Sequence, residues 1–139
     1  MSDQQITATV LGSGAWGTTF AAVLADAGCE VRLWGRNPEV AADINATRRN
    51  SAYLPDIDLP AGLTATTDAA EALAGAQLVV VAIPSQSARA TLAPLREHLA
   101  EGVVAVSLMK GVELSTDRRM SEVVAEVWGL PLDRVAVVS

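Results

Sequence analysis

Runs of apolar, β-branched residues alternate along this chain with alanine-rich stretches whose apolar positions recur at helical spacing. This alternation is typical of βαβ units that build a parallel sheet covered by helices. It predicts strands at residues 6–11, 30–34, 63–66, 77–83, 103–108 and 135–138, and helices at 15–27, 38–48, 69–74, from Ser85 or Ser87 to about 99, and 118–128. We therefore expect an α/β fold with a doubly wound, mostly parallel sheet.

Glycine, proline and aspartate mark several of the predicted boundaries. Gly28 follows the first helix as a C-terminal cap, Pro38 suits the first turn of the second helix, and Asp68 caps the third. Five consecutive apolar residues, 78–82, predict a strand that is buried on both faces. Residues 50–62 follow neither period, and we expect them to form an ordered loop.

The last predicted strand, 135–138, has no helix after it. A natural domain seldom finishes on a buried strand with nothing packed after it. We therefore expect residues 1–139 to be a single domain that is truncated at its last strand, a fragment with more polypeptide downstream.

Composition narrows the choice of partners and compartment. The net charge of −6 provides no cationic field, so nucleic acid and anionic membrane surfaces are not expected as main partners. One cysteine, Cys29, and one histidine, His98, give neither a disulfide nor the spacing of a metal site, and no metal is expected. The N-terminus has no basic region, and the apolar run at 6–11 is too short for a signal peptide or membrane span. These features favour a cytoplasmic location.

A candidate phosphate-binding turn follows the first strand, where residues 12–17 read Gly-Ser-Gly-Ala-Trp-Gly. A G-x-G-x-x-G pattern alone is weak evidence, but here it joins a strand to a helix, as in Rossmann folds that bind dinucleotides. Gly12 permits the tight turn, Gly14 lets the backbone approach a pyrophosphate, and Gly17 lets the helix pack closely on the sheet. The predicted contacts to the pyrophosphate come from Gly12, Ser13, Gly14, Ala15, Trp16 and Gly17.

Two side chains near this turn leave alternatives open. Trp16 either packs on the cofactor or substrate, or anchors the first helix to the sheet. The second strand ends in Trp-Gly-Arg-Asn, without the carboxylate that binds the ribose 2′-hydroxyl in NAD-binding folds. Arg36 is either a planar cation suited to the 2′-phosphate of NADP, or an exposed loop arginine. We expect NADP(H) to be favoured, with NAD(H) as the alternative cofactor.

Four segments together resemble the bacterial NAD(P)-dependent glycerol-3-phosphate dehydrogenase family. They are residues 12–18, 33–37, 50–55 (Asn-Ser-Ala-Tyr-Leu-Pro) and 110–113 (Lys-Gly-Val-Glu), and residues 81–86 are also similar to the family's strand and following turn. The N-x-x-Y-L-P and K-G-x-E segments are much more specific than the glycine turn. The resemblance implies an oxidoreductase that interconverts dihydroxyacetone phosphate and sn-glycerol 3-phosphate, a phospholipid precursor.

The same resemblance implies roles for individual residues. Besides the glycine turn, the residues it places at the cofactor are Trp16, Arg36, Tyr53, Pro84 and Lys110. Some family members carry serine where this chain has Ala15, so a side-chain hydroxyl contact would be lost there. The resemblance also implies a helical C-terminal domain, absent from this chain, that supplies the general acid/base lysine. We therefore expect the full-length protein to be an enzyme and this fragment to be inactive.

Position along the chain also selects Lys110. Ligands of an open α/β sheet lie beyond the carboxyl ends of its strands. Lys110 follows the predicted strand 103–108, so it should emerge at the same edge as Gly12, Arg36 and Ser85. There it would contact the substrate at the point where substrate meets cofactor. The other interpretation is a lysine exposed to solvent.

Two other functions remain open from the sequence. One is another two-domain dehydrogenase, of the ketopantoate reductase or 6-phosphogluconate type, and the other is a module that senses NADPH without catalysis. The expected partners are a phosphorylated small-molecule substrate and, for the full-length protein, a second copy in a homodimer, with no nucleic acid and no stable membrane insertion.

Overall fold

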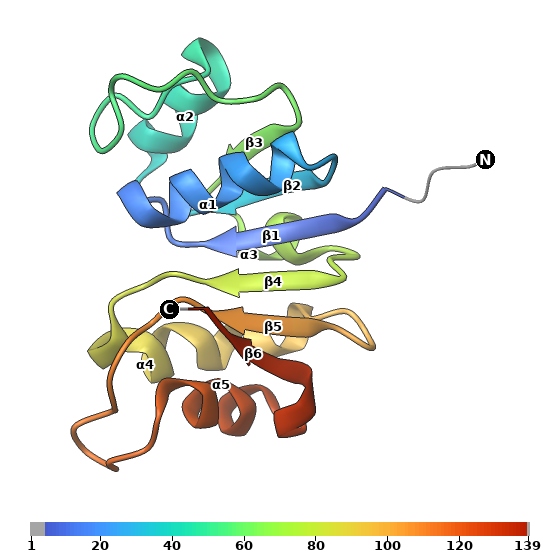
Figure 1. Ribbon diagram of the computed structural model, residues 1–139, viewed down its shortest axis with the longest axis vertical. Coiled ribbons are helices and arrows are strands. Elements are labelled where there is room, and N and C mark those ends of the chain that lie inside the picture. The colour runs from blue at the N-terminus through green and yellow to red at the C-terminus, as the bar shows by residue number, and fades with distance from the viewer. Residues whose placement is uncertain (1–4, 139) are drawn as a thin grey trace.

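The computed structural model describes residues 5–138, so the expectations about residues 1–4 and Ser139 lie outside the described residues. Its six strands form one parallel sheet in the order β3-β2-β1-β4-β5-β6 (Figure 1). The strands are β1 (Thr7–Leu11), β2 (Glu30–Trp34), β3 (Leu63–Thr66), β4 (Leu78–Val81), β5 (Val104–Ser107) and β6 (Val135–Val137). The α-helices are α1 (Ala15–Asp26), α2 (Pro38–Thr47), α3 (Ala69–Leu73), α4 (Ala88–Leu92) and α5 (Met120–Trp128), and the 3-10 helices are η1 (Ser85–Ser87), η2 (Ala93–His98) and η3 (Leu132–Arg134). The predicted doubly wound α/β fold is confirmed.

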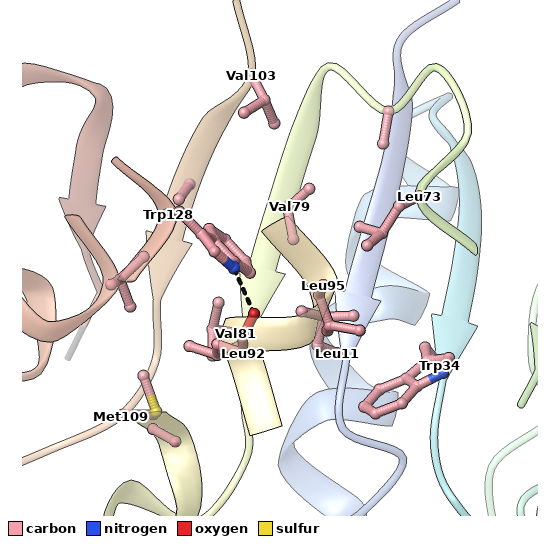
Figure 2. Close-up of a cluster of buried hydrophobic side chains, with 14 of the residues drawn as sticks. Leu11, Trp34, Leu73, Val79, Val81, Leu92, Leu95, Val103, Met109 and Trp128 are labelled. Carbon is pink, nitrogen blue, oxygen red and sulfur yellow. Dashed lines mark hydrogen bonds between the residues drawn. The ribbon is translucent and has the colours of Figure 1, made fainter. Parts of the chain in front are cut away.

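Helices cover both faces of the sheet because its central strands are apolar on both sides. Val80 of β4 belongs to the cluster under α1 and α2, whereas Val79 and Val81 belong to the cluster under α3, α4 and α5 (Figure 2). Within the second cluster, the indole N–H of Trp128 donates to the carbonyl of Leu92 at 2.9 Å, which satisfies its polar atom. The predicted strand that is buried on both faces is therefore confirmed for Leu78–Val81, whereas Ala82 lies just after it.

The order of the strands reverses between β1 and β4. β1 pairs with β2 on one side and with β4 on the other, and the chain leaves β1 for a helix on one face and β4 for a helix on the opposite face. A crevice at the carboxyl ends of two such strands is where doubly wound sheets bind their ligands. The glycine turn after β1 and residues 82–84 after β4 lie at this point.

The helix predicted after Ser85 or Ser87 is the largest departure from the sequence expectation. Only Ala88–Leu92 is α-helical, and the continuation to residue 98 is a 3-10 helix. Pro94 has no N–H to donate and its ring clashes with the carbonyl one turn earlier, so the α-helix ends before it. Neither serine caps α4 with its side chain. The hydroxyl of Ser87 instead donates to the carbonyl of Pro84 at 3.0 Å.

The other boundaries follow local chemistry closely. Asp68 caps α3 as predicted, because its carboxylate accepts from the N–H of Glu71 at 3.2 Å. Helix α5 begins two residues later than expected, since the side chain of Glu122 accepts from the N–H of Arg119 at 2.9 Å and fixes Arg119 as the cap. Across residues 5–138, no helix combines the length and apolarity needed to cross a membrane, and no three His, Cys, Asp or Glu residues group as metal ligands.

Candidate functional site

The glycine turn connects the carboxyl end of β1 to α1, and its shape depends on missing side chains. Gly12 has a φ of 120°, and a Cβ there would collide with the carbonyl of Ala82. A Cβ on Gly17 would collide with the carbonyl oxygen of Gly12, so the absence of one lets α1 approach the turn. No atom lies within 4 Å of the position that a Cβ on Gly14 would take. The turn is therefore closed on the protein side and open at Gly14.

The N-terminus of α1 presents hydrogen-bond donors at this opening. The N–H of Thr18 donates to the carbonyl of Gly14 at 3.0 Å, so the preceding N–H groups of the first turn have no partner inside the helix. No side chain caps this end, and its first turn contains no acidic residue. Free donors and the positive end of the helix dipole together favour an anion.

A loop distant in sequence supports the turn from behind. Asn50 is fully buried, and its Nδ2 donates to the carbonyl of Ser13 and to Oγ1 of Thr18, both at 2.9 Å. Sequence reasoning used Asn50 only as part of a family motif and missed this contact. Tyr53, on the same loop, has a side chain that is 53% exposed, and its N–H donates to Oδ1 of Asn50 at 3.2 Å.

A pocket of about 270 Å³ opens on one side of the turn. The end of β2 and residues that follow β4 line it, among them Arg36, Pro84, Ser87 and Thr91. The guanidinium of Arg36 donates from Nη2 to Oγ1 of Thr91 at 2.8 Å, which holds the cation at the pocket. Thr91 could not be predicted from the sequence either, because no local pattern links it to Arg36, which lies 55 positions earlier.

A second pocket, of about 520 Å³, lies on the other side of the turn and is lined by Trp16, Leu108, Lys110 and Val138. Trp16 is 52% exposed, and its ring stands edge-on to that of Phe20 with centroids 6.0 Å apart. It therefore faces the pocket rather than anchoring α1 to the sheet. Lys110 follows β5 at the edge of the sheet where its position in the sequence places it, and its side chain is exposed at this pocket.

The loop between β5 and α5, which carries Lys110, is held by hydrogen bonds from the segment after β4. The amide of Gln86 donates to the carbonyl of Val112 at 3.0 Å and accepts from the N–H of Leu114 at 3.1 Å. This segment also contributes Pro84 and Ser87 to the first pocket. One short stretch of chain therefore lines the first pocket and supports the lysine of the second.

Charged groups fasten the same loop to α4 and α5. Nε of Arg89 lies 3.0 Å from the carboxylate of Glu113, and the hydroxyl of Thr116 donates to that carboxylate at 2.6 Å. The hydrogen bonds from Arg89 and Thr116 lower the pKa of Glu113, which is only 6% exposed, and the hydrogen bonds to Glu113 and Glu126 raise the pKa of Arg89 further above its ordinary value. Glu126 pairs with Arg89 at 2.6 Å and with Arg118 at 3.1 Å. Glu113, the last residue of the K-G-V-E segment, is thus ionised and structural.

The predicted site residues therefore share one edge of the sheet but divide between two pockets. Arg36 and Pro84 line the first, and Trp16 and Lys110 line the second, with the glycine turn between them. Tyr53 lines neither of these two pockets and lies on the loop that supports the turn.

Residues 7–139 match the protein family described as the N-terminus of NAD-dependent glycerol-3-phosphate dehydrogenase. The chain belongs to this family. It is 58% identical over 134 residues to the glycerol-3-phosphate dehydrogenase (NAD(P)+) of Streptomyces griseus, which covers 96% of this chain and 40% of that protein. The corresponding protein of Thermobifida fusca is 57% identical over 131 residues, which is 94% of this chain and 39% of that protein.

The fold agrees with this assignment. The crystal structure of glycerol-3-phosphate dehydrogenase from Coxiella burnetii superposes with a TM-score of 0.83 at 28% identity, over 96% of this chain and 39% of that one. The family and the Rossmann-type fold expected from the motifs are both confirmed. The chain spans about 40% of the length of the curated relatives it matches.

Proposed function

We propose that residues 1–139 form the cofactor-binding domain of an NAD(P)-dependent glycerol-3-phosphate dehydrogenase. The full-length protein would add a helical domain that carries the general acid/base lysine. The observation that carries this proposal is the opening at Gly14, which lies at the crevice between β1 and β4 with a pocket on each side. Family membership then supports the choice of reaction.

A dinucleotide fits the residues around this opening. The glycine turn, residues 12–17, would hold the pyrophosphate, because a Cβ at Gly14 would be the first atom in its path and the N-terminal donors of α1 face the same space. The adenosine part would occupy the pocket of about 270 Å³ against Pro84. When bound, the nicotinamide ring supplies or accepts the hydride.

Arg36 supports a preference for NADP(H) over NAD(H). The end of β2 carries no carboxylate to accept from a ribose 2′-hydroxyl, and Arg36 brings a permanent cation to the pocket there. A hydrogen bond to a charged partner contributes about 1.5–3 kcal/mol, which is enough to separate two cofactors that differ only in one phosphate.

Lys110 supports the assignment of the substrate as dihydroxyacetone phosphate or sn-glycerol 3-phosphate. Its ammonium would donate to the reacting oxygen and offset the charge of the substrate phosphate, in a domain whose net charge is −6. Trp16 would form the opposite wall of the pocket of about 520 Å³. The sn-glycerol 3-phosphate formed would serve as the backbone precursor of phospholipids.

We also propose a cellular location and an oligomeric state for the full-length protein. We place it in the cytoplasm, where a chain segment with one unpaired cysteine stays reduced, and expect it to form a homodimer. Cell fractionation and light scattering of the full-length protein test these two points.

Binding and turnover, measured on two lengths of the protein, test the main proposal. The 139-residue chain should bind NADPH in a fluorescence titration but should not oxidise it in the presence of dihydroxyacetone phosphate. The full-length protein should do both. Turnover by the short chain would contradict the proposal that a second domain supplies the general acid/base lysine. Turnover of ketopantoate or 6-phosphogluconate instead, or NADPH binding without any turnover by the full-length protein, would favour a related dehydrogenase or an NADPH sensor respectively.

A further inference from the structure

The loop that begins at Asn50 makes a buried junction with the glycine turn. Both hydrogen bonds from Nδ2 of Asn50 run at 2.9 Å, one to the carbonyl of Ser13 and one to Oγ1 of Thr18. Thr18 in turn donates to the carbonyl of Ser13 at 3.3 Å. Asn50 has no exposed surface, so leaving either amide hydrogen without a partner would be costly. The amide is therefore fixed in one orientation.

The remaining polar groups of Asn50 close its own loop. Its Oδ1 accepts from the N–H of Tyr53 at 3.2 Å, and its main-chain carbonyl accepts from the N–H of Leu54 at 2.7 Å. The donor side of the amide thus faces the glycine turn and the acceptor side faces the loop. A single side chain couples the two segments.

The geometry of the peptide bond carries this coupling to the open side of the turn. The carbonyl of Ser13 and the N–H of Gly14 belong to one planar trans peptide unit, so they point in opposite directions. Because Asn50 and Thr18 hold the carbonyl toward the interior, the N–H of Gly14 is held away from it, toward the side on which a Cβ of Gly14 would meet no atom. A donor fixed in advance costs no reorganisation when an anion arrives.

We propose that Asn50 is a positioning residue that aims the peptide N–H of Gly14 at the pyrophosphate of the bound dinucleotide. This inference rests on the proposed function of the turn as the pyrophosphate site. A neutral amide suits the position, because it donates to the carbonyl of Ser13 without adding negative charge behind an anion site. A carboxylate of the same shape would repel both the carbonyl and the phosphates.

The test compares two ligands that differ in the pyrophosphate. NADPH contains it, whereas adenosine 2′-monophosphate retains the adenine, ribose and 2′-phosphate but lacks it. In calorimetric titrations of the 139-residue chain, Asn50→Asp should weaken NADPH tenfold or more and change the affinity for adenosine 2′-monophosphate by less than twofold. A role confined to folding would not separate the two ligands.

Asn45 offers a matched control. Its Nδ2 donates to the carbonyl of Ala65 at 2.8 Å and its Oδ1 accepts from the N–H of Ala65 at 2.9 Å, so the same amide chemistry ties α2 to β3 away from the turn. Asn45→Asp should leave the affinities for both ligands within twofold of wild type, whatever it does to thermal stability.

Thermal melting first establishes which variants fold. If Asn50→Asp does not fold, Thr18→Val decides instead, since it removes the hydroxyl that links Asn50 to Ser13 while keeping the shape; it should weaken NADPH about threefold and leave adenosine 2′-monophosphate unchanged. Equal losses for both ligands, or no loss, in a folded variant of a wild type that binds NADPH would overturn the inference alone. A wild-type chain that binds neither NADPH nor NADH would overturn the proposed function and the inference with it.

Discussion

The glycine turn and the loop that carries Lys110 lie at the same edge of the sheet but are held by different kinds of interaction. The glycine turn is held by neutral groups: the amide of Asn50, the hydroxyl of Thr18, and the N–H of Gly12, which donates to the carbonyl of Trp34 at 2.8 Å. The loop carrying Lys110 is held in part by the neutral amide of Gln86, and within residues 5–138 it also has what the turn lacks, ion pairs among the charged side chains Arg89, Glu113, Arg118 and Glu126.

The difference fits what each side is proposed to bind. An anion site made of backbone donors is weakened by a nearby carboxylate, so neutral supports leave its field intact. The loop of Lys110 already presents a cation, and its supporting charges balance as two arginines against two glutamates. Neutral supports do not titrate near neutral pH, whereas the charged ones respond to acid and salt.

Steric closure of the turn is the feature most sensitive to mutation. Alanine is favoured over glycine in a helix by about 1 kcal/mol, yet Gly17→Ala places a Cβ against the backbone carbonyl of Gly12, which cannot move aside as a side chain would. We expect a net loss of about 3 kcal/mol in the free energy of unfolding, at the upper end for overpacking. Urea unfolding monitored by circular dichroism measures it.

Gly14→Ala is the matched control on the same turn. Gly14 has a φ of −75° and no atom near its Cβ position, so the variant should be as stable as wild type while binding NADPH poorly. Equal stability of both alanine variants would show that the turn is not closed sterically.

On the charged side, Lys110 should matter for reaction more than for folding. In the full-length protein, Lys110→Ala should lower kcat/KM a hundredfold or more, about 2.7 kcal/mol of transition-state stabilisation, with little change in NADPH affinity. Arg119→Ala is the control, since Arg119 borders a neighbouring pocket of about 290 Å³ with Lys110 but not the pocket shared with Trp16. A Lys110 variant within threefold of wild type would assign this lysine to the solvated surface.

Arg36 places a charge on the otherwise neutral side, where it should act on one cofactor only. Arg36→Ala should weaken NADPH several-fold to a hundredfold, about 1.5–3 kcal/mol for a charge-assisted contact, and leave NADH nearly unchanged. Thr91→Val removes the hydroxyl that orients the guanidinium and should produce a smaller loss in the same direction. Equal losses for the two cofactors would show that Arg36 does not contact the 2′-phosphate.

The smallest effect concerns the pH dependence of the ion pairs. Because the pKa of Glu113 is lowered in the folded state, its stabilisation is present above the ordinary glutamate pKa and is lost as pH falls through the lowered value. The difference in the free energy of unfolding between wild type and Glu113→Gln should therefore shrink in acid. Urea unfolding at several pH values measures it, with the exposed Glu101→Gln as control. If this difference does not change with pH, Glu113 stabilises the fold through its packing and not through its charge.

Sequence patterns predicted what local chemistry determines. Runs of apolar, β-branched residues located the strands, helical spacing located most helices, and the glycine turn located the crevice, because each depends on residues only a few positions apart. The break in the helix after β4 also has a local signal, since Pro94 cannot continue an α-helix, although the apolar pattern alone predicts a helix to about residue 99.

Contacts between distant segments could not be predicted from the sequence in this way. Asn50 meets Ser13 across 37 positions and Arg36 meets Thr91 across 55, and neither pair shows a period or spacing that would join them. The lowered pKa of Glu113 likewise depends on Arg89, which the fold brings to it from 24 positions away. The place of Lys110 at the sheet edge could be predicted because following a strand end is itself a local property.

The separation between Asn50 and Ser13 also bears on how the domain folds. Helix α1 can form from contacts among near neighbours, whereas the hydrogen bond from Asn50 closes a loop of 37 residues that contains β2 and α2. We expect a contact of this kind to form late, and interactions absent from the transition state act on the unfolding rate. A dinucleotide that recognises only the completed turn would therefore lengthen the lifetime of the native state without hastening its formation.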